Sequence, residues 1–137
     1  MKRQESLWLQ PSEYVNEAYH CVRPFVLESA DRIEVPIITG HSLGGAIATI
    51  AAIDIQYNLK KIPILITFAC PKIGNKEWAI SGRNRLPDQY HFVNRWDIVH
   101  RLPFTLRHPV ETIESDLGWF DPHNLKNFAK IGSCQYG

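Results

Sequence analysis

Ser42 stands at the centre of Gly40-His41-Ser42-Leu43-Gly44, a spacing in which a serine hydroxyl can act as a nucleophile. Such a serine needs a sharp turn that pushes its side chain away from the backbone. We expect the flanking residues to be glycines because a Cβ at either position would collide with the crowded backbone. The hydroxyl would lie at a helix N-terminus, where the Leu43 N–H is the natural first donor to a developing oxyanion. The competing interpretation is a glycine-rich turn in which Ser42 only caps a helix.

The residues on either side of this turn predict the elements that position it. Residues 33–39 form an apolar, β-branched run that is typical of a buried strand, and residues 46–55 are rich in Ala and Ile, as in a helix. Gly45 would let that helix pack close to the sheet. A strand, a turn and a helix in this order are the context in which the motif marks a nucleophile.

A serine hydroxyl is a weak nucleophile near neutral pH and needs a base, which in turn needs an orienting acid. Where a nucleophile occupies this kind of turn, an acid and then a histidine follow it along the chain. Asp97 comes shortly after the predicted strand 90–94, at the end of a sheet where ligands bind. Asp88 precedes that strand, and Asp116 and Asp121 leave little room for a base after them. Asp97 is therefore the predicted acid, with a turn-capping aspartate as the alternative.

The predicted base is His123, because it lies in a loop between the last predicted strand and the last predicted helix. A loop residue can reach the ends of the strands. His108 is the alternative base, although it falls inside a possible strand over residues 106–114. His100 is too close to Asp97 to reach Ser42. We expect His41 to point away from the Ser42 hydroxyl and, like His91, to have a structural role.

The remaining elements predict an α/β fold with a mostly parallel sheet. Residues 12–29 have helical periodicity, which Pro24 should kink or interrupt. Residues 62–69 are apolar almost throughout, which is typical of a strand that is covered on both faces. Pro109 would confine the strand over 106–114 to an edge or a bulge. A helix starts within residues 76–80, and a short terminal helix is predicted over 125–131.

The composition indicates one globular domain over residues 1–137, with 45% hydrophobic residues and a net charge of +1. This charge gives no electrostatic basis for binding nucleic acid. Cys21, Cys70 and Cys134 are odd in number and lack metal-site spacing, so reduced thiols are the simpler expectation, with one disulfide as the alternative. The N-terminal residues contain no apolar signal-peptide core, so the default expectation is a cytoplasmic location.

Several motifs, in the same order along the chain, resemble the class 3 (fungal-type) triacylglycerol lipase family of α/β hydrolases. The resemblance extends over residues 12–129, nearly the whole chain. It includes the serine motif, a strand with the loop that follows it, the loop that contains the acid, and the C-terminal segment that contains the base. His108 matches a family histidine that is not the base. These motifs occupy residues 37–46, 67–75, 94–103 and 123–128.

The resemblance implies a serine carboxylic-ester hydrolase that acts on lipid esters through Ser42, Asp97 and His123, with an acyl-enzyme intermediate. It implies no metal and no organic cofactor. It also implies that this chain is the C-terminal half of the fold, because family domains are much longer. The early strands, the lid and the second oxyanion donor would then precede residue 12, and losing one such donor typically costs about a hundred- to a thousand-fold in rate.

Two further expectations follow from that shortness. The strand at residues 33–39 would be an apolar sheet edge, which favours self-association or pairing with a missing N-terminal half. The alternative function is an inactive lipase-like remnant or interaction module. An acyltransferase or peptidase would fit the same three residues but not the whole set of motifs.

Overall fold

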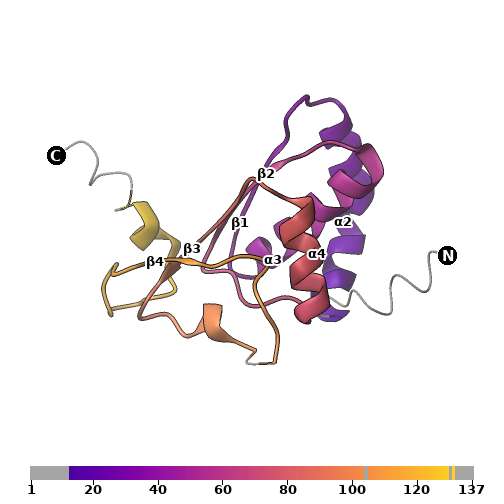
Figure 1. Ribbon diagram of the computed structural model, residues 1–137. Helices are drawn as coiled ribbons and strands as arrows, with labels where there is room; N and C mark the ends of the chain where they lie inside the picture. The colour runs from indigo at the N-terminus through magenta and orange to yellow at the C-terminus, as the bar shows by residue number, and fades with distance from the viewer. Residues whose placement is uncertain (1–12, 104, 130, 132–137) are drawn as a thin grey trace.

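A four-stranded parallel sheet organises the computed structural model, which describes residues 13–103, 105–129 and 131 (Figure 1). The strands lie in the order of the chain: β1 (Ile37–His41), β2 (Ile64–Phe68), β3 (Gln89–Asn94) and β4 (Ile113–Ser115). The helices are α2 (Glu13–Asp31), α3 (Leu43–Leu59) and α4 (Lys76–Arg85), with 3-10 helices η1 (Val99–Arg101) and η2 (Leu125–Phe128). This arrangement confirms the predicted α/β class.

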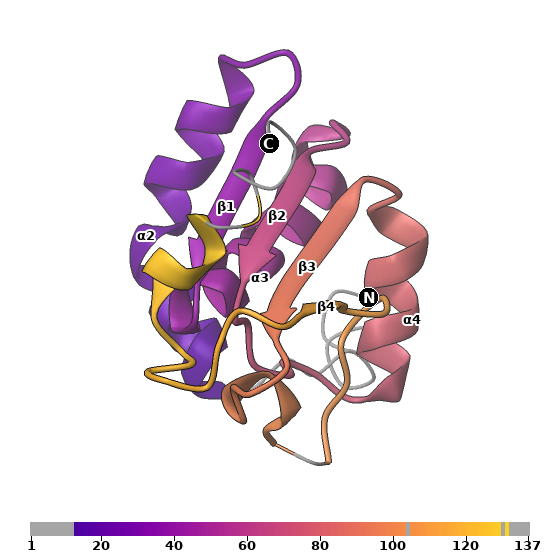
Figure 2. The same ribbon diagram turned by 90° about the vertical axis from the view of Figure 1, so that its left-hand side faces the viewer.

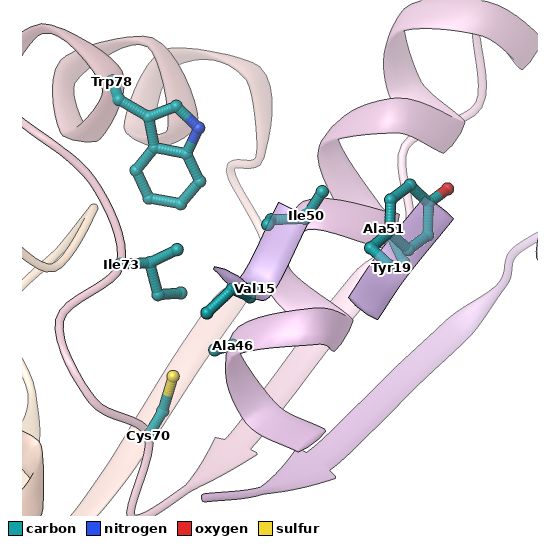
Figure 3. Close-up of a cluster of buried hydrophobic side chains, with 8 residues drawn as sticks. All are labelled: Val15, Tyr19, Ala46, Ile50, Ala51, Cys70, Ile73 and Trp78. Carbon is teal, nitrogen blue, oxygen red and sulfur yellow. The ribbon is translucent and has the colours of Figure 1, made fainter. Parts of the chain in front are cut away.

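Helix α3 is buried on several sides because it lies between the sheet and α2. Its sequence is accordingly apolar nearly all round, with Ala46, Ile50 and Ala51 in the main hydrophobic cluster. Tyr19 of α2 and Trp78 of α4 close the same cluster (Figure 3). The small alanines allow close helix contacts, and the packing places the N-terminus of α3 firmly at the end of β1.

Helix α2 runs from Glu13 to Asp31 without a break, so Pro24 does not interrupt the helix, and the alternative expectation of a kink stays a prediction. Pro24 lies on the exposed side of the helix, where water can satisfy the carbonyl that loses its N–H donor. The last turn of α2 is held from outside by Lys61, whose Nζ donates to the carbonyls of Ala30, Asp31 and Ile33 at 3.1, 2.6 and 2.8 Å.

The described residues cover the second face of the sheet only in part: alternate residues of β2 are half-buried there, so the prediction of full cover on both faces of residues 62–69 is met on one face only. The C-terminal segment crosses this face, opposite α3 (Figure 2), and Leu117 and Phe128 pack against Phe68 and Phe92 there. Toward the other end of the strands, β1 and β2 keep exposed or half-buried side chains among the described residues. Ile37 of β1 is 66% exposed, and β1 is an edge strand of the described sheet. Self-association through this edge stays a prediction.

The first and the fourth predicted strands differ most from the structure. The first begins at Ile37, not at residue 33, and Pro36 immediately precedes it. The strand expected over residues 106–114 is mostly wrong, because only Ile113–Ser115 pairs with β3. Arg107 instead forms an isolated antiparallel bridge with Gly74, and Pro109, which cannot donate to a sheet, lies between the bridge and β4.

A chain of buried polar groups runs through the centre of the sheet. The Gln89 amide donates to the carbonyls of Gly82 and Leu86, so its Oε1 accepts from His91 Nε2, 3.0 Å away. The other ring nitrogen, Nδ1, then accepts from the Thr67 hydroxyl at 2.6 Å. His91 is therefore neutral, and burial lowers its pKa to about 4. The expectation of a structural role for His91 agrees with this placement.

The buried neutral His91 predicts that acid weakens the fold. Its folded-state pKa lies below the ordinary value of 6.5, so the unfolded chain binds the proton more readily. The stabilisation is complete above pH 6.5 and is lost as the pH falls toward 4, by about 3 kcal/mol. Urea unfolding at several pH values in this window measures the slope. His91→Asn should flatten it, whereas His20→Gln, at an exposed position on α2, should not; equal slopes in all three proteins would contradict the prediction.

Candidate active site

Ser42 occupies the turn between β1 and α3 in a strained conformation with a positive φ, at φ 56° and ψ −125°. The turn is held by its N–H, which donates to the Phe68 carbonyl of β2 at 2.9 Å. Its side chain makes no capping hydrogen bond to α3, which argues against the helix-cap interpretation. Leu43 is the first residue of α3, so its N–H is one of the N-terminal donors that have no acceptor within the helix.

The two glycines of the motif differ in the reason for their presence. A Cβ on Gly40 would lie 2.2 Å from the carbonyl oxygen of Gly44, a contact that backbone atoms cannot relieve. A Cβ on Gly44 would meet no atom within 4 Å, so the expected collision there is wrong. Gly45 behaves as predicted: a Cβ would come within 3.1 Å of Cys70 Cβ, because α3 packs closely on β2.

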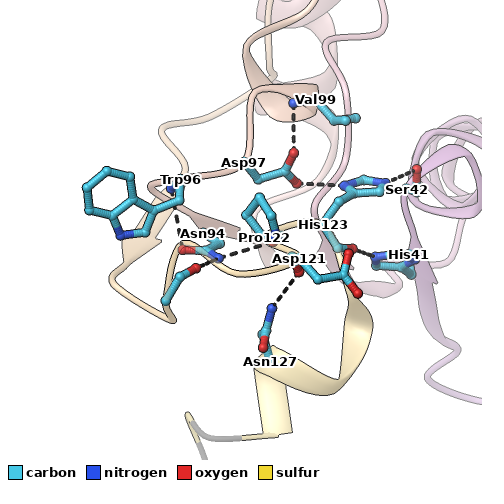
Figure 4. A network of polar contacts seen from close by, with 11 residues as sticks. His41, Ser42, Asn94, Trp96, Asp97, Val99, Asp121, Pro122, His123 and Asn127 are labelled. Carbon is cyan, nitrogen blue, oxygen red and sulfur yellow. Dashed lines mark hydrogen bonds and ion pairs between the residues drawn. The ribbon is translucent and has the colours of Figure 1, made fainter.

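The three predicted site residues lie in one hydrogen-bonded line (Figure 4). Ser42 Oγ is 2.7 Å from His123 Nε2, and His123 Nδ1 is 2.6 Å from Asp97 Oδ2. The serine and the histidine are 81 residues apart along the chain. This geometry allows Nδ1–H to donate to the carboxylate, which leaves Nε2 free to accept the serine proton.

Asp97 is held rigidly in the turn that leaves β3. Its side chain is only 2% exposed, and its Oδ1 accepts from the Val99 N–H at 2.8 Å. Its own N–H donates to the Asn94 carbonyl at 2.9 Å. One carboxylate oxygen is thus used by the backbone and the other faces His123, so the aspartate can orient the ring without turning away.

Two residues that position His123 received no such role from the sequence. His41 Nε2 donates to the His123 carbonyl at 2.8 Å, and the two rings lie 4.9 Å apart, so the serine turn contacts the histidine loop directly. Asn94, fully buried, donates to the carbonyls of Gly118 and Pro122. A signal was available for Asn94, since a polar residue in the last position of a buried strand must find internal partners.

The alternative acids and bases lie elsewhere. His108 Nε2 donates to the His100 carbonyl at 2.7 Å. His100 is buried in η1, and burial lowers its pKa. Asp116 is exposed and accepts from the Trp96 indole N–H at 2.9 Å. Asp121 accepts from the Asn124 side chain at 2.8 Å.

Comparison with known proteins gives the site a family context. A model of the lipase (class 3) family matches residues 7–107. The chain is 30% identical over 133 residues to a secreted mono- and diacylglycerol lipase of Malassezia restricta, covering 93% of this chain and 37% of that protein. It is 42% identical over 122 residues to a putative lipase of Saccharomyces cerevisiae, covering 80% and 34%. The crystal structure of a lipase from Rhizopus microsporus var. chinensis aligns with a TM-score of 0.64 and 28% identity over 77% of this chain and 40% of that chain.

A parallel sheet that presents a serine on a strand-to-helix turn, together with these structural matches, defines an α/β-hydrolase fold. Within that class, the chain belongs to the lipase (class 3) family. It spans little more than a third of the length of the curated relatives described above, 37% and 34%.

The comparisons also bear on where the protein is located. Relatives named as secreted lipases give no support to the expected cytoplasmic location. None of the described helices has the length and apolar character needed to cross a membrane.

Cys21 and Cys70 are free thiols, exposed and buried respectively, whereas Cys134 lies outside the described residues.

Proposed function

We propose that this chain carries the reactive residues of a carboxylic ester hydrolase acting on lipid esters. Ser42 is the nucleophile, His123 the general base and Asp97 the orienting acid. The observation that supports this most directly is the line of two short hydrogen bonds, 2.7 Å from Ser42 Oγ to His123 Nε2 and 2.6 Å from His123 Nδ1 to Asp97 Oδ2. Family membership supports the ester as the substrate class.

The reaction would proceed through an acyl-enzyme. His123 Nε2 takes the Ser42 proton as Oγ attacks the ester carbonyl carbon, and the carbonyl oxygen becomes an oxyanion beside the Leu43 N–H. The intermediate collapses when His123 passes the proton to the leaving alcohol, which breaks the C–O bond. Water then attacks the acyl carbon, with His123 again as the base, and releases a carboxylate and free Ser42. Asp97 stays ionised and stabilises the imidazolium ion in both steps.

The lipid nature of the substrate rests on the relatives. Two kinds of activity occur among their names, mono- and diacylglycerol lipase in Malassezia restricta and phospholipase A(1) in Arabidopsis thaliana. Hydrolysis of a lipid ester bond is common to both. We therefore assign the substrate as a lipid carboxylic ester.

The proposal predicts that the purified chain hydrolyses p-nitrophenyl butyrate and is labelled by a fluorophosphonate probe. Ser42→Ala should abolish labelling and lower kcat by about a million-fold, because the reacting oxygen is lost. Ser29→Ala, on α2, serves as the matched control and should retain both signals. A signal that survives in Ser42→Ala would remove Ser42 from the nucleophile role. The absence of any signal in the parent chain would favour the inactive lipase-like remnant.

A further inference from the structure

Two aromatic side chains project from the loop that leads from β4 to His123. Trp119 is 73% exposed and Phe120 is 81% exposed. Their rings lie 6.4 Å apart at 84°, the edge-to-face arrangement that aromatic pairs favour. A protein surface seldom keeps large aromatic groups this exposed, one beside the other, unless they contact something. The pair belongs to the same loop as His123, which follows Phe120 by three residues.

The loop that carries the aromatic pair is fastened at both ends. Asn94 Nδ2 donates to the Gly118 carbonyl at 2.9 Å and to the Pro122 carbonyl at 3.1 Å, and its Oδ1 accepts from the Leu117 N–H at 3.2 Å. Gly118 and Asp121, which bracket the pair, adopt left-handed conformations with φ of 100° and 45°. Figure 4 shows the buried amide of Asn94 beneath this loop. The aromatic pair is thus presented on a rigid base, and little conformational entropy would be lost when it binds.

The chemistry of the surroundings favours a neutral or zwitterionic lipid surface as the occupant. Nearby charges balance in sign: Arg95 lies 3.8 Å from Asp116, Arg101 lies 3.9 Å from Glu114, and the exposed Asp121 and Lys126 add one charge of each sign. Leu125, just beyond His123, is a further exposed apolar residue. Trp and Phe are suited to the boundary between lipid and water, where Trp can keep its N–H in the polar layer. A strongly charged protein partner would be expected to meet an excess of the opposite charge here, whereas a neutral lipid surface would not.

We propose that Trp119 and Phe120 insert into the surface of the lipid that contains the ester substrate, and so bring His123 and Ser42 to that surface. This inference rests on the proposed function, since it assigns how that site meets its substrate. The aromatic pair takes no part in bond making. Its contribution is to binding at the interface, and soluble substrates do not need it.

The test measures binding apart from hydrolysis. Sedimentation with phosphatidylcholine vesicles is carried out with the chain carrying Ser42→Ala, so that no lipid is consumed. Adding Trp119→Ser and Phe120→Ser together should lower the partition coefficient by about 30-fold or more, because two aromatic side chains no longer leave water. Phe25→Ser is the matched control: Phe25 is also 73% exposed but lies on α2, and its loss should change partitioning less than about twofold. High salt should leave the parent binding intact, since the attraction is not ionic.

The hydrolysis arm uses the chain with Ser42 intact. The Trp119→Ser, Phe120→Ser variant should keep kcat/KM for p-nitrophenyl butyrate and lose activity on emulsified diacylglycerol in parallel with vesicle binding. Unchanged partitioning in this variant, or an equal loss in Phe25→Ser, would overturn the proposal. Loss of self-association in place of loss of vesicle binding would also overturn it and assign the pair to a protein contact. Vesicle binding through the aromatic pair without any ester hydrolysis would instead refute the proposed function and leave the lipid contact standing.

Discussion

Asp97→Asn is expected to lower kcat for a soluble ester by about ten thousand-fold while the protein stays folded. The reason lies in the second hydrogen bond of the carboxylate. The Val99 N–H, 2.8 Å from Oδ1, needs an acceptor, so the asparagine oxygen will occupy that position. The amide nitrogen then faces His123 Nδ1, where the carboxylate accepted at 2.6 Å. Nδ1 must accept instead of donate, the ring proton moves to Nε2, and His123 can no longer take the proton of Ser42.

Steady-state kinetics and the pH profile of the variant check this result. KM should change little because Asp97 is buried behind the histidine, away from the substrate. At high pH, hydroxide ion can take the Ser42 proton in place of His123, so part of the activity should return. Asp88→Asn, at the opposite end of β3, is the control and should stay within about twofold of the parent. An Asp97→Asn enzyme with near-parental kcat would show that the aspartate does not set the tautomer.

Gly40→Ala is expected to lower the free energy of unfolding by about 3 kcal/mol or more. The added Cβ would stand 2.2 Å from the Gly44 oxygen, 2.4 Å from the Gly44 carbonyl carbon and 2.7 Å from the Gly45 nitrogen, all of them backbone atoms. No flexible side chain is available to move aside. Relief requires opening the turn, which would shift Ser42 away from His123, so fluorophosphonate labelling should fall along with stability.

Gly44→Ala is the matched comparison in the same motif. Its Cβ would meet nothing within 4 Å, so its free energy of unfolding should remain within about 1 kcal/mol of the parent, with labelling retained. Urea unfolding of the two variants side by side makes the measurement. An equal loss of stability in both variants would mean that the motif requires glycine for its helix or turn propensity. The collision at Gly40 would then not be the cause.

The local parts of the site could be predicted because each depends on neighbours in the chain. The strand, the turn and the helix around Ser42 follow from residues within a few positions of one another, and the placement of Asp97 follows from its distance beyond β3. The partner of Ser42 was harder, because His108 and His123 both had suitable positions along the chain. Of these two, the structure places His123 within hydrogen-bonding distance of Ser42 Oγ, at 2.7 Å, whereas His108 contacts the His100 carbonyl.

The errors arose where the outcome depends on solvent or on distant packing. The proline-containing helix α2 continues past Pro24 because that side faces water, which its residue type alone does not indicate. The strand expected over residues 106–114 was replaced by a bridge from Arg107 to Gly74, a contact between loops. Gly44 looked equivalent to Gly40 in the motif, yet only Gly40 faces backbone from the next turn of the chain.

By itself the sequence determined which groups could do chemistry and the order of the elements that carry them, since periodicity, glycine turns and residue types act locally. Only the tertiary structure decided which of these groups meet. Parallel strands bring their carboxyl ends to one edge of the sheet, and there Asn94 fastens the loop of His123 while His41 contacts it from the serine turn. Ser42 and His123 are 81 residues apart in the sequence, and the packing of the whole sheet brings them into contact. A contact between residues so far apart in the sequence depends on how every intervening element packs, so spacing along the chain cannot specify it.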